Sequence, residues 1–406
     1  MQTKTPKLRY IPELLTLHLE ELEFLWGQRR IAMHSPRHFL RDFLHLNERL
    51  EAHIQGLLNV PQALPDLLVP QLMAAESRDS VFSAACTLLR LANPELTAQV
   101  VKCFEQADAA TAAGFRDAFS FAPAGQFVNP LKQILHEGES LHAAFAATAL
   151  ANLRVLDKNN TALSALLLHD DSLIATTAWQ ASLAVDCLPS SAQQLRPYQQ
   201  ALLRPEQTIR DAVLKSAIWT QQPWALPVLR QLASAGDSAA VQWLAIVTTG
   251  EDGGLIVAQL KLIESSQSRC DLLVRFGHPG VLKILRDWMS GDDALLASLS
   301  GEAFTRITGF DVRGERIQLP ISDSADDFDR EFSPLIWTTD IHKVDAYMQQ
   351  NGSRLNGAKR WSRGLSLDGA VTQETMVAMD LKIRWDQLAR HRLAGELSSQ
   401  PEPIVY

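Results

Sequence analysis

Four histidines near the start of the chain come closest to a metal-binding pattern. His34, His38, His45 and His53 lie within about twenty residues of one another. A structural metal site needs three or four ligands that converge on one point. Pro36 interrupts the helix between the first two histidines, and helical geometry places the last two at neighbouring but not stacked angles. We therefore expect no metal and no cofactor here, and histidines that line or cap a helical hairpin.

Catalytic motifs are the next class to test. The sequence contains no Walker A loop, no GxGxxG after a strand, no HExxH and no GxSxG, so nucleotide-binding, zinc-peptidase and α/β-hydrolase mechanisms lack their starting residues. The triplet His169-Asp170-Asp171 has acid–base side chains, but it falls at a predicted turn where Asp171 is explained as a helix N-cap. We therefore predict no catalytic residues.

Charge and cysteine usage limit the compartment and the partners. The formal charge is −8 and the pI is about 5.8, so no global positive field attracts nucleic acid or anionic lipid. Glutamates between residues 13 and 23 interrupt any signal-peptide core, and no uncharged stretch is long enough to cross a bilayer. Four widely spaced cysteines form no CxxC pair and have apolar neighbours, which indicates buried thiols in a reducing compartment: Cys86, Cys103, Cys187 and Cys270. These features favour a soluble, cytoplasmic protein.

Tryptophans are the side chains best suited to protein binding, because they are enriched at binding hot spots. Trp179 and Trp243 lie inside alanine-rich helical phrases, where we interpret them as core residues. Trp224 follows Pro223 in a turn. It is therefore the best candidate for an exposed tryptophan in the central part of the chain.

A second group of binding candidates lies near the C-terminus. Lys359, Arg360 and Arg363 surround Trp361, and a desolvated tryptophan beside an arginine fork contributes more to binding than charges at the rim of an interface. We interpret these four residues as protein-binding candidates. The alternative is that Trp337 and Trp361 both pin the tail onto the last repeat; we favour this interpretation for Trp337 and keep Trp361 as the better binding candidate.

The elements that must position these residues are short helices that recur along the chain. From residue 65 to 315, phrases rich in alanine and leucine are separated by turn residues and repeat about every 30 residues, which fits two short helices and two turns per unit. An acidic or polar residue heads each second helix and can cap its free N–H groups. The expected heads are Asp79, Asp108, Glu139, Asp171, Gln207, Asp237 and Ser268.

The segments that flank the repeats differ in pattern. Residues 1–64 predict a helical hairpin, whose first helix carries an apolar stripe of Ile11, Leu14, Leu15, His18, Leu22, Leu25 and Trp26. Residues 316–336 predict an acidic linker, in which the run from Asp323 to Glu331 is either solvated or contacts a basic partner or a divalent cation. Residues 337–406 predict a small helical module. The fold class is thus all-α, a HEAT-like solenoid with a helical segment at each end.

The repeats resemble HEAT or HEAT-like repeats. Further segments are similar to a family of bacterial HEAT-repeat proteins often encoded beside type VI secretion genes for spike, PAAR and adaptor proteins: His18 to Trp26, Asn47 to His53, Gly301 to Gly309, and Trp337 to Lys359. The resemblance spans nearly the whole chain and implies a role in handling or neutralising a secreted effector, without catalytic residues. Ala346-Tyr347 stands where that family is expected to have paired tryptophans.

These observations favour a protein partner, because the inner helices of a solenoid line a long surface suited to extended contact. The expected function is that of a non-enzymatic accessory protein of a type VI secretion module. It would bind an effector or a spike-associated protein as chaperone, loading adaptor or immunity protein, with no small-molecule substrate. The alternatives are a HEAT-like enzyme of the lyase or DNA-base glycosylase type, disfavoured by the acidic charge, and a purely structural scaffold.

Overall fold

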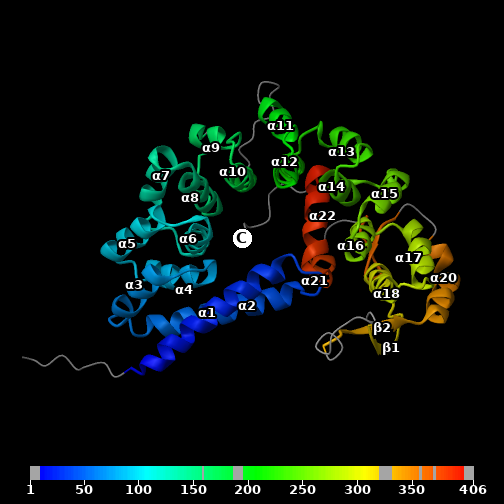
Figure 1. Cartoon of the computed structure of the whole chain (residues 1–406), viewed down its shortest axis with the longest axis horizontal. Helices are drawn as coiled ribbons and strands as arrows, with labels where there is room; N and C mark the ends of the chain where they lie inside the picture. Colours follow the sequence, from blue (N-terminus) through cyan, green and yellow to red (C-terminus); the bar gives the residue numbers. More distant parts are fainter. Residues whose placement is uncertain are drawn as a thin grey trace, which may run out of the picture. The chain divides into compact units, whose positions relative to one another are not determined.

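Figure 1 shows the computed structural model of the chain, which describes residues 10–157, 160–185, 195–319, 332–355, 359–368 and 372–396. Helices account for 71% of the residues that the structure describes, and the strands among them are few and short. The predicted all-α helical-repeat fold is therefore confirmed. Contacts within the described residues define two units: the first runs up to Thr220 and includes Asp380–Lys382, and the second comprises Gln221–Met379 and continues from Ile383.

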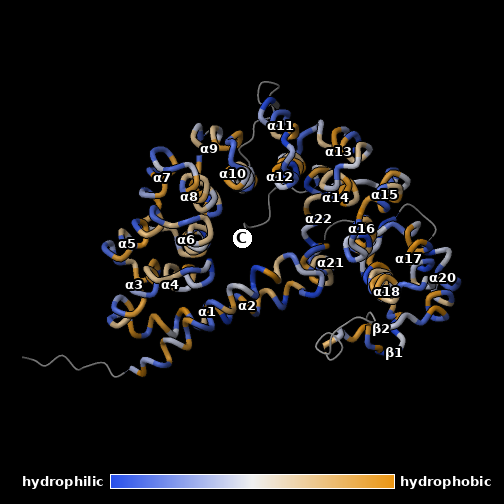
Figure 2. The backbone as a smooth tube through the Cα atoms, viewed as in Figure 1, coloured by the Kyte–Doolittle hydropathy of each residue, from blue (hydrophilic) through white to orange (hydrophobic). Residues whose placement is uncertain are grey.

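A helical hairpin opens the first unit, as predicted, and consists of α1 (Pro12–Met33) and α2 (Leu40–Leu58). Pro12 supplies the fixed φ that suits a first helical position, and the backbone N–H of Phe39 donates to the Asp42 carboxylate at 2.8 Å at the start of α2. The predicted apolar stripe of α1 is only partly right, since Ile11 and Leu14 are exposed. Figure 2 shows hydrophobic residues recurring along the whole of α1.

Pairs of helices follow the hairpin in the first unit. The first helices of the pairs are α3 (Leu64–Ala74), α5 (Pro94–Glu105), α7 (Val128–Glu137), α9 (Thr161–Leu166) and α11 (Leu195–Leu202). The second helices are α4 (Arg78–Arg90), α6 (Ala109–Phe121), α8 (Ser140–Asn152), α10 (Ser172–Val185) and α12 (Gln207–Trp219). Each second helix packs on the next one, from α4 through α12, so that neighbouring pairs bury a continuous core.

The second unit continues the same pattern with three pairs. They are α13 (Ala225–Ser234) with α14 (Ser238–Val247), α15 (Gly253–Gln259) with α16 (Ser266–Phe276), and α17 (Leu282–Met289) with α18 (Ala294–Thr308). Again the second helices stack, α14 on α16 and α16 on α18.

Helix caps confirm part of the predicted repeat register. The side chains of Asp108, Asp171 and Asp237 accept hydrogen bonds from backbone N–H groups of the first turns of α6, α10 and α14. Three predicted heads are wrong by one to three positions. Ser77 caps α4 in place of Asp79, and Ser265 caps α16 in place of Ser268. Glu206 and not Gln207 occupies the N-cap position of α12. Glu139 occupies the N-cap position of α8 as predicted, but its side chain accepts no capping hydrogen bond. Several adjacent polar residues satisfy the same local pattern, so only the backbone path decides which one caps.

The segment predicted as an acidic linker, residues 316–336, forms strands at both ends. β1 (Arg313–Gln318) pairs antiparallel with β2 (Leu335–Thr339), and the register shifts between Arg313 and Arg316. β2 consists of β-branched, aromatic and leucine residues, which suit a pleated surface. The linker interpretation is therefore corrected for these residues, whereas the acidic run from Asp323 to Glu331 lies outside the described residues.

The remaining elements belong to the predicted C-terminal module, which is not purely helical. They are α20 (Ile341–Leu355), β3 (Trp361–Ser362), β4 (Leu365–Ser366), α21 (Gln373–Ala378) and α22 (Leu381–Leu393). β3 and β4 pair antiparallel across a two-residue turn, with Arg363 at φ 49° and Gly364 at φ 77°. Both central residues thus have the positive φ that tight hairpin turns require.

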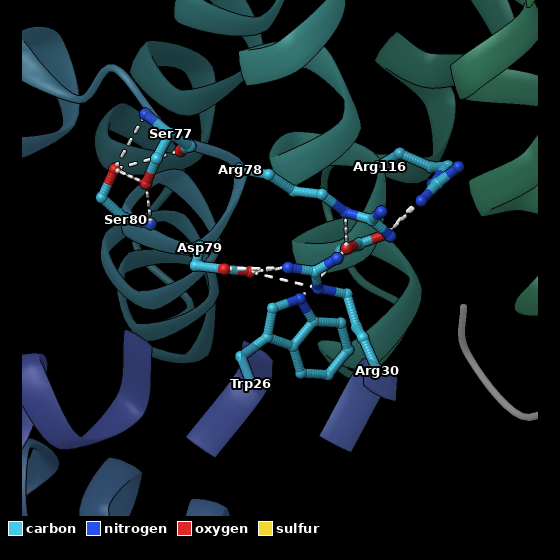
Figure 3. Close-up of polar contacts among 8 residues, drawn as sticks. Trp26, Arg30, Ser77, Arg78, Asp79, Ser80 and Arg116 are labelled. Atoms are coloured by element: carbon cyan, nitrogen blue, oxygen red, sulfur yellow. Dashed lines mark hydrogen bonds and ion pairs between the residues drawn. The ribbon is translucent and has the colours of Figure 1, made fainter. Parts of the chain in front are cut away.

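A buried carboxylate fixes α1 against the repeats of the first unit (Figure 3). Asp117 of α6 is fully buried, and its oxygens accept from the Trp26 indole at 3.0 Å and from the guanidinium groups of Arg78 and Arg116 at 2.7 Å. Trp26 also stacks on Phe82, with ring centroids 3.7 Å apart. A buried charge requires such pairing, so this Asp117 cluster determines which face of α1 turns inward.

Candidate functional site

Arg360, a predicted binding residue, does not lie on the surface. Its side chain is 0% exposed and donates to carbonyl oxygens at the ends of two helices. The acceptors are Ala245, Ile246 and Thr248 at the end of α14 and Arg275 and Phe276 at the end of α16, at 2.6 to 2.9 Å. The guanidinium thereby satisfies carbonyls that have no partner within their own helices. Burial lowers the pKa of Arg360 to about 9, so the group is still charged at neutral pH.

The backbone around Arg360 continues this role. We name residues 359–368 the C-terminal strap. The N–H of Trp361 donates to the carbonyl of Gly277 at 2.8 Å, and the N–H of Arg363 donates to the carbonyl of Arg306, the last turn of α18, at 2.6 Å. A Cβ at Gly277 would lie 2.6 Å from the Trp361 carbonyl oxygen. The strap therefore closes the ends of α14, α16 and α18, and glycine permits its close approach.

The other predicted binding residues near Arg360 do not gather on one exposed surface. Trp361 is only 9% exposed, and the guanidinium of Arg354 lies over its ring at 4.7 Å. Arg363 is half-buried, and Lys359 alone is exposed. The predicted hot spot of Trp361 with three basic residues is thus not assembled on the surface, because Arg360, Trp361 and Arg363 all hold helix ends.

Tryptophans within the repeats match their predictions more closely. Trp179 and Trp243 are buried core residues, and the Trp179 indole donates to the carbonyl of Leu167 at 3.0 Å. Trp224 occupies the N-cap position of α13 and is half-buried, less exposed than the turn after Pro223 suggests.

Trp337 is 40% exposed, which differs from the expectation that it pins the tail onto the last repeat. It lies on β2 between two cations, with the guanidinium carbons of Arg313 and Arg316 5.2 and 5.3 Å from its ring centroid. Leu335, two residues earlier, lies on the same face of the strand and is also exposed. We call Arg313, Arg316, Leu335 and Trp337 the Trp337 platform.

The end of β2 is anchored to α18. The Thr339 hydroxyl donates to the carbonyl of Ala297 at 3.1 Å, and a Cβ at Gly301 would lie 2.4 Å from the Thr339 hydroxyl oxygen. Gly301 therefore allows β2 to contact the helix directly. The Asp311 carboxylate pairs with Arg313, which lowers the pKa of Asp311 to about 2. These contacts hold β2, and with it the partly exposed Trp337, in place.

Residues weighed for chemistry have structural partners. Asp171 caps α10, and its own N–H donates to His169 Nδ1 at 3.0 Å. Burial raises the pKa of Cys86 to about 12 and that of Cys270 to about 11, which makes both thiols poor nucleophiles. Cys187 lies outside the described residues. Within the described residues, no group of three or more His, Cys, Asp or Glu side chains has metal-binding geometry.

Two of the histidines interact with each other across the hairpin. The Nδ1 atoms of His18 on α1 and His53 on α2 lie 2.9 Å apart, and a Cβ at Gly56 would lie 2.7 Å from the His18 ring. Burial and the nearby His18 lower the pKa of His53. His34 and His45 are exposed. The sequence pattern missed this pair because His18 lies outside the cluster of four.

Comparison of the chain with family models, with curated proteins and with solved structures finds no match. Among the described residues, the helices are either too short or too polar to span a membrane.

Proposed function

We propose that this chain is a non-catalytic protein-binding protein that engages its partner through the Trp337 platform. The observation that carries the proposal is an exposed tryptophan between Arg313 and Arg316 on a strand anchored to α18. Tryptophan and arginine dominate binding hot spots. A pre-positioned platform also loses little conformational entropy when it binds.

The platform favours a partner surface that offers a pocket for an aromatic ring beside carboxylates. The guanidinium groups of Arg313 and Arg316 lie over the Trp337 ring, and planar guanidinium groups match carboxylates in two-point contacts. The salt bridge from Arg313 to Asp311, 2.7 Å, leaves Arg316 as the stronger determinant of charge recognition.

The biological setting that we propose is a bacterial type VI secretion module, and the support for it is the resemblance of the sequence segments described above together with the helical-repeat fold. In that setting the partner is an effector or a spike-associated protein, bound stoichiometrically. A chaperone, a loading adaptor and an immunity protein share this binding step. They differ in whether the partner without this chain is insoluble, unsecreted or toxic.

Affinity purification from the native host, followed by mass spectrometry, tests the proposal. The full-length chain is compared with Trp337→Ala, with Arg316→Glu, and with Leu203→Ala as a matched control, because Leu203 is an exposed apolar residue far from the platform in sequence. We expect a specific partner with the wild type and the control, and its loss from both platform variants at unchanged melting temperature. Recovery of generic chaperones alone, or equal recovery with all variants, contradicts the proposal.

A further inference from the structure

Helix α1 carries apolar side chains on two faces, and only one of them is used inside the protein. The buried face includes Leu15, Leu19, Leu22, Leu25 and Trp26. On another face, Leu14, Leu17, Phe24 and Ile31 are exposed, from 49% for Leu14 to 65% for Ile31. We call these four residues the α1 seam. A row of large exposed apolar side chains on one helix marks an interaction site rather than scattered surface hydrophobics.

The spacing of the α1 seam fits a helical partner. Steps of three, seven and seven residues from Leu14 place all four side chains at the a and d positions of one heptad frame. Glu21 and Gln28 fill the remaining positions of that frame, and both are half-buried. Polar residues at such positions specify register in paired helices. At 1.5 Å per residue the seam extends over roughly 25 Å, about five helical turns.

Contacts inside the first unit prevent α1 from turning this face inward. The Trp26 indole donates a hydrogen bond to the Asp117 carboxylate at 3.0 Å. Arg30, about one helical turn later, forms an ion pair with Asp79 at 2.7 Å. Rotation of α1 about its axis would break both contacts and expose Leu22 and Leu25, which are fully buried. The seam is therefore a fixed, outward-facing feature of the fold.

Negative charges flank one side of the seam, and Glu21, within its heptad frame, pairs with Arg49 of α2 at 3.4 Å. Glu13 and Glu20 are exposed, and Glu20 lies one turn from both Leu17 and Phe24. Burial raises the pKa of Glu23, the hydrogen bond from Ser83 lowers it, and the neighbouring carboxylates of Asp79 and Glu20 raise it further. A partner with basic residues along its flanks complements this field.

The same charges argue against a second copy of this chain as the occupant. In the heptad frame of the seam, Glu13 and Glu20 occupy g positions, and the e positions are His18, Leu25 and Ala32. A parallel pair sets g against e of the other copy, and an antiparallel pair centred on the seam sets Glu20 opposite Gly27, so neither glutamate meets a lysine or arginine of a second copy.

We propose that the α1 seam binds an amphipathic helix of another protein, one with apolar residues at heptad spacing and Lys or Arg along the flank that meets Glu13 and Glu20. This site is separate from the Trp337 platform and is tested without it. A helix laid along an apolar strip is an established mode of peptide recognition, in which anchors at i, i+3 and i+7 supply the affinity.

A synthetic peptide serves as the probe. It has about 21 residues, three heptads, with leucine at the a and d positions and lysine at the flanks, and it carries a fluorophore. Binding to the full-length chain is followed by fluorescence anisotropy. A scrambled peptide of the same composition controls for general attraction of a basic peptide to an acidic protein, and a peptide with glutamate flanks tests the charge preference.

Three variants localise the site. Phe24→Ser removes the central anchor, Met73→Ser removes an exposed apolar residue of α3 as a matched control, and Glu13→Lys with Glu20→Lys reverses the flank. We expect the lysine-flanked peptide to bind at least roughly tenfold more tightly than the scrambled one, and Phe24→Ser but not Met73→Ser to abolish that difference. The reversed variant should prefer the glutamate-flanked peptide by roughly fivefold. The melting temperature should not change, because Phe24 is 58% exposed.

Several results overturn the proposal. One is equal binding of the ordered and scrambled peptides; another is peptide binding that is indifferent to Phe24→Ser. Concentration-dependent dimerisation that Phe24→Ser abolishes would assign the seam to a second copy instead. Trp337→Ala should bind the peptide like the wild type, so failure at the seam is distinguishable from failure of the proposed function.

Discussion

Nη1 of Arg360 donates a hydrogen bond to the carbonyl oxygen of Ile246 at 2.6 Å, across 114 residues of sequence. The same guanidinium reaches the end of α16 through the carbonyl of Phe276. Helix C-termini carry partial negative charge, which a buried cation stabilises. One side chain from the C-terminal strap thus completes the hydrogen bonding of two repeat helices.

Replacing Arg360 with leucine should lower the free energy of unfolding of the second unit by about 3 kcal/mol or more, because several buried carbonyls lose their donors. Arg360→Lys keeps the charge, but one ammonium group cannot reach five acceptors. The free energy of unfolding of this variant should therefore lie between those of the wild type and Arg360→Leu. Urea denaturation followed by circular dichroism measures both. Lys359→Ala, at the exposed neighbouring position, is the control and should leave the midpoint unchanged; equal midpoints for Arg360→Leu and wild type would refute the capping role.

Asp117 and Asp79 both bind side chains of α1. They should differ widely in their contribution to the free energy of unfolding. Asp117→Ala leaves the buried Arg116 and the indole of Trp26 without their acceptor, so we expect a cost of about 3–5 kcal/mol. Asp79→Ala breaks an ion pair with Arg30 in which both side chains are about 30% exposed, and such pairs contribute roughly 0–1 kcal/mol. Chemical denaturation of the two variants side by side gives the comparison. Similar losses would show that Asp117 is not the anchor of α1.

The pair of His18 and His53 should make stability depend on pH. The folded-state pKa of His53 lies below the ordinary value of 6.5, through burial and then through His18, so the unfolded chain binds more protons as the pH falls through this range. Glu21 favours the charged form and Arg49 opposes it. Stability should therefore be full above about pH 7 and decline towards pH 5.5. Urea midpoints at the two pH values measure this, and His53→Leu should reduce the difference; an unchanged difference would assign it to other groups.

Replacing an alanine at one of three matching places in successive repeats with a larger residue should destabilise the protein. Ala144, Ala178 and Ala212 are all buried in second helices, so a leucine at any of them overpacks a helix interface at a typical cost of roughly 1–3 kcal/mol. Thermal melts of the three variants test this, with Ala98→Leu, exposed on α5, as the neutral control. If all three melt like the wild type, these helices do not pack as closely as the fold requires.

Much of the repeat architecture was predictable because its signals are local. Asp108, Asp171 and Asp237 cap the helices that follow them, and caps and apolar periodicity act within one or two turns. The pairing of β1 with β2 was missed, since it joins segments on either side of the acidic run and includes a shift between Arg313 and Arg316. Short strands of this kind leave little periodic signal.

The candidate binding residues were harder to rank, because burial depends on contacts distant in sequence. Trp337 and Trp361 both lie in the C-terminal part of the sequence, yet only the second is covered, by Arg354 and by the helix end at Gly277. On α1 the two apolar faces merge into one pattern in the sequence, so exposed Leu14 was assigned to the same stripe as buried Leu15. A periodic pattern identifies apolar residues but not which face has a partner within the fold.

The C-terminal strap also has a consequence for synthesis on the ribosome. Ile246 emerges 114 residues before Arg360, and at about 5–20 residues per second translation takes roughly 6–23 s to cover that interval. During this time the ends of α14 and α16 must be solvated or held by chaperones. A chain that stops before residue 359 never gains the closing contacts, so premature termination near the end of the coding sequence should yield a product prone to aggregation and degradation.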